Sequence, residues 1–116
     1  MKKTVIVYLL KAGAKMVYTL SQIQEKIVPI CREWGIAKLL LFGSYARGEA
    51  TENSDIDFVV YDTENKLAGS GFYALVGDLR NIFNTNKVEV VDSSEIESIP
   101  WIAFNIKNEG VALYES

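Results

Sequence analysis

The sequence contains no histidine and a single cysteine, Cys31, and each absence excludes a class of chemistry. Without histidine, the chain has no His-based nucleophilic relay and no imidazole metal ligand. One cysteine cannot form a disulfide within the chain, which is consistent with a reducing cytoplasm. Basic residues are also few, since 12 Lys and Arg stand against 15 Asp and Glu for a net charge of -3. This balance argues against direct, nonspecific nucleic-acid binding, although a local basic rim around Lys38 and Arg47 remains compatible with it.

The apolar run near the N-terminus, residues 4–10, is far too short to span a membrane. Together with Lys2 and Lys3 it imitates a signal peptide, but Lys11 closes it early, so export is not expected. We therefore set residues 1–16 apart as an N-terminal extension, with three alternatives: an added strand, an oligomer contact or an upstream start codon. Residues 17–116 are expected to form one domain.

What the chain does contain is enough apolar material for one core, since 49% of its 116 residues are hydrophobic and 23% are charged. Short apolar runs predict strands at about residues 38–42, 57–61 and 87–91. Helical periodicity separates these runs. The expected fold class is therefore α/β (α+β), a short mixed sheet with helices packed against it.

The first helical region begins at a Thr19 or Ser21 cap and stops at Gly35, with a kink expected at Pro29. Within it, Cys31 falls on the apolar stripe, so it is expected to be a core residue rather than a reactive thiol.

A second helical region should pack an apolar stripe against the sheet, made of Phe72, Leu75, Val76, Leu79, Ile82 and Phe83. The third opens on a capping box formed by Ser94 and Glu97 and restarts at Pro100. Trp101 and Phe104 lie off its inward stripe. They either complete the core or form part of a partner surface.

Two short motifs carry the candidate chemistry. Gly43-Ser44 ends one apolar run, and Asp55 and Asp57 open the next after ten intervening residues. Side chains alternate along a strand, so the two carboxylates share one side. Their repulsion predicts either a raised pKa or a bound cation, and magnesium prefers oxygen ligands together with substrate phosphates. The turn offers amides and a hydroxyl to a phosphate, above all where a helix begins, and Arg47 adds positive charge.

Taken singly, each motif has a simpler interpretation. Asp-x-Asp often caps a strand end, and Gly-Ser is often an ordinary turn, because loops are rich in these residues. Both motifs at this spacing arise by chance in about one chain in a thousand of this length. The combination favours a phosphate and metal site.

The stretch of residues 42–57 resembles the minimal nucleotidyltransferases of the polymerase-beta-like superfamily, whose pattern is Gly-Ser, ten residues and Asp-x-Asp. The resemblance extends from about Val17 to the ending at residues 110–115. It implies the polymerase-beta-like nucleotidyltransferase fold and two-metal nucleotidyl transfer. It also implies that Asp55 and Asp57 hold Mg²⁺, and that Gly43 and Ser44 bind the phosphates of ATP with a weaker contribution from Arg47.

The family's pattern includes a third carboxylate on a neighbouring strand, and here the chain departs from it. Glu89 stands where the family has Asp. The resemblance implies that it completes the site for the second metal ion and helps the acceptor hydroxyl to lose its proton. An acid inside an apolar strand must be paired or ligated, which supports this role. Its extra methylene moves the carboxylate outward, however, so catalysis could be slowed while nucleotide binding survives. Asp92 is the rival third acid, unless it begins a turn with Ser93 and Ser94.

Size constrains the acceptor. Larger enzymes of this superfamily carry an added domain for the second substrate, so a partner chain or a second copy is expected to supply part of the acceptor site here. Proteins that resemble this one are commonly antitoxins paired with a small HEPN-domain toxin, and they transfer AMP from ATP to a tyrosine of that toxin. This cytoplasmic role is the leading hypothesis. The alternatives are a module that neutralises its partner by contact alone, and a nucleotidyltransferase acting on a small molecule such as an aminoglycoside.

Overall fold

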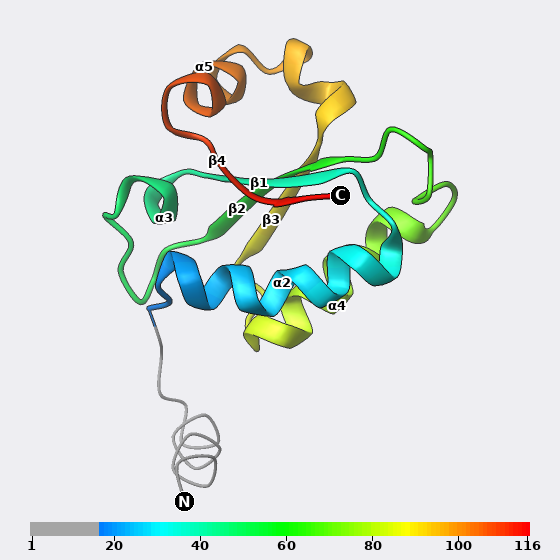
Figure 1. Cartoon of the computed structure of the whole chain (residues 1–116). Coiled ribbons are helices and arrows are strands. Elements are labelled where there is room, and N and C mark those ends of the chain that lie inside the picture. Colours follow the sequence, from blue (N-terminus) through cyan, green and yellow to red (C-terminus); the bar gives the residue numbers. More distant parts are fainter. Residues whose placement is uncertain (1–16) are drawn as a thin grey trace, which may run out of the picture.

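The computed structural model describes residues 17–116, which form a four-stranded sheet with helices on both of its faces (Figure 1). The alternatives for residues 1–16 lie outside the described residues. Within the described part of the chain, no helix is long and apolar enough to cross a membrane.

The sheet has the strand order β3-β2-β1-β4. Its strands are β1 (Lys38–Phe42), β2 (Ile56–Tyr61), β3 (Val88–Asp92) and β4 (Val111–Glu115). β1 is antiparallel to both of its neighbours, whereas β2 and β3 are parallel, so the predicted mixed sheet is confirmed. The three predicted strands lie within one residue of their expected bounds, and β4 adds a fourth at the edge beside β1.

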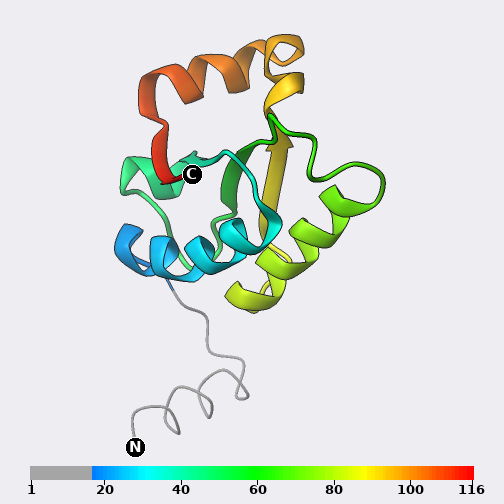
Figure 2. The ribbon, with the colours of Figure 1, turned by 45° about the vertical axis from the view of Figure 1, so that its right-hand side comes forward.

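Two helices, α2 (Leu20–Trp34) and α4 (Gly71–Phe83), cover one face of the sheet. The 3-10 helix η1 (Ser93–Ser98) and helix α5 (Pro100–Glu109) cover the other, as the turned view of Figure 2 also shows. The sheet is therefore the middle layer of three.

Strand alternation divides β1 between two cores. Leu39 and Leu41 belong to the larger core under α2 and α4, whereas Leu40 and Phe42 belong to a smaller core under α5. Because successive side chains point to opposite faces, both faces of this central strand are apolar. This explains why its sequence is a continuous apolar run.

The same alternation places the acidic residues. In β2, Phe58 and Val60 belong to the larger core and Val59 to the smaller one, so Asp57 lies on the smaller-core face. Glu89 pairs with Asp57 in the parallel register of β2 and β3 and lies on that face too. The candidate carboxylates therefore share a face with α5.

Helix α2 shows how local sequence signals set its ends. Thr19 is its N-cap: the Thr19 hydroxyl accepts from the Gln22 amide at 3.1 Å, and the Gln22 side chain accepts from the Thr19 amide at 2.9 Å. This capping box selects Thr19 over Ser21. Gly35 ends the helix with a φ of 68°, as predicted, and the helix runs through Pro29.

Cys31 is fully buried, which confirms that it is a core residue. Burial raises the pKa of its thiol to about 12, so the reactive thiolate is scarce at neutral pH.

Two local predictions are wrong. No Ser94–Glu97 box caps the segment after β3, because the Asp92 carboxylate accepts from the Ser94 amide at 2.9 Å and is itself the cap of η1. Ile82 does not join the core stripe, since it is 41% exposed. Trp101 and Phe104 are exposed as well, so they do not complete the core.

The junction between α5 and β4 generates a stability prediction. A Cβ at Gly110 would lie 2.6 Å from the Ile106 carbonyl oxygen and 2.8 Å from a Leu40 methyl carbon. We expect Gly110→Ala to lower the free energy of unfolding by about 1–3 kcal/mol, because the carbonyl cannot move without disturbing the helix end. Urea denaturation of the full chain measures this.

Gly77 is the matched control, because a Cβ there meets nothing within 4 Å inside helix α4. Gly77→Ala should stabilise the protein by about 0.5–1 kcal/mol through helix propensity. Equal stability of the two variants would contradict the proposed crowding at Gly110.

Candidate functional site

The site is built on the turn between β1 and helix α3 (Ser44–Arg47). Phe42 at the end of β1 pairs with Asp57 of β2, which brings the following residue, Gly43, against the Asp57 side chain. Gly43 has a φ of 78°, a backbone conformation that favours glycine. A Cβ at this position would collide with the Asp57 carboxylate oxygen Oδ2. Both the backbone and the space beside it therefore require glycine here.

Asp55, Asp57 and Glu89 form what we call the acidic group, and Asp57 is its half-buried member. Its pKa is raised from 3.8 to about 6, first by burial and then by the negative charges of Asp55 and Glu89, while Arg47 acts in the opposite direction. The carboxylates are therefore close enough to repel one another. This confirms one of the two outcomes predicted for paired acids.

Glu89 is exposed on β3, which is an edge strand of the sheet. The expectation that it must be paired or ligated because of burial is therefore wrong, since water can solvate its carboxylate. Its register still sets it directly beside Asp57.

Asp92 lies at the other end of β3, opposite Val60. Its carboxylate accepts from both the amide and the hydroxyl of Ser94, at 2.9 and 2.8 Å. Asp92 therefore begins a turn, which is the other interpretation of this residue, and Glu89, which pairs with Asp57 in the register of β2 and β3, stays the candidate third acid.

The donor set fits a hard cation, because Asp55, Asp57 and Glu89 offer carboxylate oxygens whose mutual repulsion a cation would relieve. Across residues 17–116, however, no three Asp, Glu or Cys side chains are already gathered into a metal-binding group. These three residues remain the predicted ligands.

The anion-binding side of the site differs from the expectation in one respect. Helix α3 does begin at Ser44, directly after the Gly43 turn. The Gly43 amide, however, donates to the Glu109 carboxylate oxygen Oε1 at 3.3 Å, and Arg47 Nη1 donates to the same oxygen at 3.0 Å. Arg47 Nε donates to Glu49 at 3.0 Å.

Sequence reasoning missed Glu109. It lies at the end of α5, 62 residues beyond Arg47, so no local spacing connects the two. Its position directly before the family-like ending at residues 110–115 was the only available signal.

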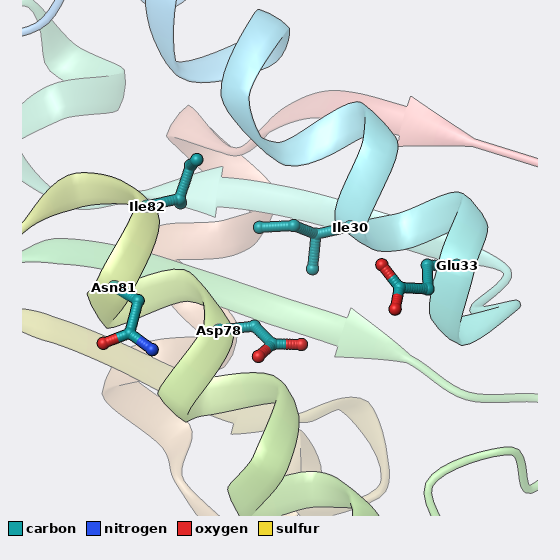
Figure 3. A pocket seen from close by; sticks show the side chains of 5 residues that line it. All are labelled: Ile30, Glu33, Asp78, Asn81 and Ile82. Carbon is teal, nitrogen blue, oxygen red and sulfur yellow. The ribbon is translucent and has the colours of Figure 1, made fainter.

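A separate hollow of about 330 Å³ lies between α2 and α4, lined by Ile30, Glu33, Asp78, Asn81 and Ile82 (Figure 3). Asp78 accepts from the Trp34 indole at 2.8 Å and has a structural role there. None of the candidate residues lines this hollow. It lies on the face of the sheet that α2 and α4 cover, whereas the acidic group lies on the face that α5 covers.

Comparison with known proteins places these features in a family. Residues 25–116 match the family described as "Polymerase beta, Nucleotidyltransferase". "Putative protein adenylyltransferase MJ1379" of Methanocaldococcus jannaschii is 35% identical over 96 residues, which are 78% of this chain and 94% of that protein. "Protein adenylyltransferase MntA" of Aphanizomenon flos-aquae is 31% identical over 107 residues, which are 84% of this chain and 69% of MntA.

A solved structure is similar as well. The "Crystal structure of the toxin-antitoxin with AMP-PNP" superposes with a TM-score of 0.63 and 25% identity, over 80% of this chain and 73% of that one. The family match includes the Gly43 turn, the Asp55 and Asp57 pair and the Glu89 strand. Because that match spans most of the chain and its relatives are named protein adenylyltransferases, this chain belongs to the polymerase beta nucleotidyltransferase family.

Proposed function

We propose that this chain is a cytoplasmic, magnesium-dependent protein adenylyltransferase, the antitoxin half of a toxin–antitoxin pair with a HEPN-domain toxin. In this role it transfers AMP from ATP to a hydroxyl group of the partner: the hydroxyl oxygen bonds to the α-phosphorus, pyrophosphate leaves, and Glu89 helps the hydroxyl to lose its proton. The observation that carries the proposal is the contact between the Gly43 turn and Asp57, which sets a phosphate-sized turn beside a group of carboxylates. The relatives named protein adenylyltransferases and the toxin–antitoxin structure with AMP-PNP support it.

In the proposed reaction, Asp55, Asp57 and Glu89 would hold magnesium, which would supply positive charge to the triphosphate and the reacting phosphorus. The Ser44 hydroxyl and the amides at the start of α3 donate to the phosphates. The guanidinium of Arg47 has five N–H donors. Within residues 17–116, its hydrogen bonds run from Nε to Glu49 and from Nη1 to Glu109, so Nη2 is the group proposed to donate to a phosphate oxygen.

The acceptor hydroxyl must reach the site from outside. Asp55 and Glu89 are exposed and Asp57 is half-buried, so the acidic group faces solvent at one end of the sheet. A hydroxyl on a partner surface can approach it there. Trp101 and Phe104 are exposed on α5, which covers this same face, and they offer apolar contact area for such a partner.

Neutralisation by contact alone is the second candidate. Two observations favour it: the acidic side chains of residues 17–116 are not gathered into a metal-binding group, and position 89 is Glu where the family pattern has Asp. In that case toxin neutralisation would survive the double substitution Asp55→Asn with Asp57→Asn.

Asp57→Asn tests the enzymatic proposal. Losing a metal-ligating carboxylate should remove several kcal/mol of transition-state stabilisation, so we expect transfer to fall by about a hundredfold or more. The measurement is incorporation of label from α-phosphate-labelled ATP, with magnesium, into the neighbouring gene product.

Glu52→Gln provides the control, because this exposed carboxylate lies in the loop that leads into β2 and the change is also isosteric. Label transfer that persists in Asp57→Asn would overturn the proposed role of Asp57.

Gly43→Ala tests the contact at the turn. The new Cβ would displace the Asp57 carboxylate, so we expect loss of label transfer together with a destabilisation of about 1–3 kcal/mol. Gly48→Ala is the matched control, since Gly48 also has a positive φ, 74°, but a Cβ there meets nothing within 4 Å. If both variants lose activity equally, backbone strain rather than the contact with Asp57 is responsible.

The raised pKa of Asp57 predicts a pH dependence. The folded protein holds this proton more tightly than the unfolded chain, so the group's contribution to stability is present below about pH 4 and is lost as the pH rises through about 6. Protonation also removes a ligand, so magnesium with ATP should raise the melting temperature at about pH 7.5 and much less at about pH 5.

Thermal unfolding followed by circular dichroism, at both pH values, measures these effects. The contribution of Asp57 is the difference between the wild type and Asp57→Asn. An identical pH dependence in the two proteins would show that Asp57 does not titrate in this range.

A further inference from the structure

Glu109 connects the end of α5 with the Gly43 turn and helix α3, which lie more than 60 residues earlier in the chain. From the end of α5 its oxygen Oε1 accepts from the Gly43 amide and from Arg47 Nη1, at 3.3 and 3.0 Å. Its side chain is only 17% exposed. The tight packing of the next residue, Gly110, against Leu40 keeps the end of α5 close to β1. The position of this carboxylate is therefore set by the fold.

Glu49 provides a contrast within the same structure. It also pairs with Arg47, through Nε at 3.0 Å, but its side chain is 66% exposed and it lies only two residues from Arg47. It does not accept from the Gly43 amide. An exposed ion pair of this kind contributes little. Glu49 therefore matches Glu109 in charge and in its arginine partner, but not in burial or in contact with the turn.

The restraint on Arg47 has a consequence for the acidic group. Arg47 is close enough to Asp57 to interact with its charge. A guanidinium free to pair with that carboxylate would compete with a cation for its oxygens and would leave the phosphate side of the turn. A partly buried hydrogen-bonded carboxylate on α5 holds the guanidinium at the turn instead.

We propose that Glu109 is a positioning residue for nucleotide binding, which holds the Gly43 turn and the Arg47 guanidinium in the arrangement that receives the phosphates. This inference rests on the proposed function, because it concerns the ATP site of that reaction. Glu109 touches neither nucleotide nor metal in this role and acts through Gly43 and Arg47.

Isothermal titration calorimetry tests the inference, with ATP and magnesium as the probe and the full chain in four forms: wild type, Glu109→Ala, Glu109→Gln and Glu49→Ala. We expect Glu109→Ala to weaken ATP binding by about tenfold, because a charge-assisted bond and the ordering of the turn are lost together. Glu109→Gln should be intermediate, since its amide oxygen can accept from Gly43 but carries no charge. Glu49→Ala should change the dissociation constant by less than about twofold.

The calorimetric stoichiometry separates positioning from folding, because a misfolded fraction lowers the number of sites and leaves their dissociation constant unchanged. If Glu109→Ala does not fold, the dissociation constants of Glu109→Gln and Glu49→Ala for ATP are compared instead.

Unchanged binding in the Glu109 variants would overturn the inference. Tighter binding would overturn it as well, and would show that the carboxylate occupies the place of a phosphate oxygen and must leave.

Equal weakening in Glu49→Ala would attribute the effect to the charge near Arg47 rather than to the turn. A wild-type chain that binds no ATP would overturn the proposed function and this inference together, whereas binding by the wild type with unaltered variants overturns the inference alone.

Discussion

The contact between Gly43 and Asp57 is the constraint on which the site depends. The antiparallel register of β1 and β2 sets the end of one strand beside the start of the next, and only a residue without a side chain fits between them. This closeness lets helix α3 begin directly beside a carboxylate whose pKa is already raised. The residues proposed to bind phosphate and a cation would otherwise be held apart by at least one side chain.

The two faces of the sheet differ in what they carry: one holds most of the apolar core, and the other holds the candidate site. The side under α2 and α4 holds the larger core, which includes the inert Cys31. The side under α5 holds a smaller core and, at one end, the acidic group. Substitutions in the larger core are therefore expected to change stability first, whereas α5 lies close enough to the site to influence it directly. Glu109 is the residue through which that influence is transmitted.

Local signals in the sequence predicted the features that depend on neighbouring residues. The Thr19 cap, the Gly35 stop and the strand bounds follow from side-chain geometry within a few residues, and the structure confirms them. The predicted box at Ser94 failed because a competing local acceptor, Asp92, precedes it by two residues. Periodicity included Ile82 in the core stripe, but periodicity does not say how wide a stripe the neighbouring helix covers.

The sequence by itself determined the family, the mixed sheet and the motif that brings Gly43 and Ser44 towards Asp57. The strands and turns follow from strand alternation and turn chemistry, which are local properties, whereas the family follows from the resemblance that the spaced Gly-Ser and Asp-x-Asp motifs carry. Only the tertiary structure decided that β3 is an edge strand, that Glu89 on it is exposed, and that Asp92 lies too far along that strand to join the acidic group. It alone brought Glu109 to the Gly43 turn, because the order of strands and the packing of α5 depend on contacts between residues far apart in the chain.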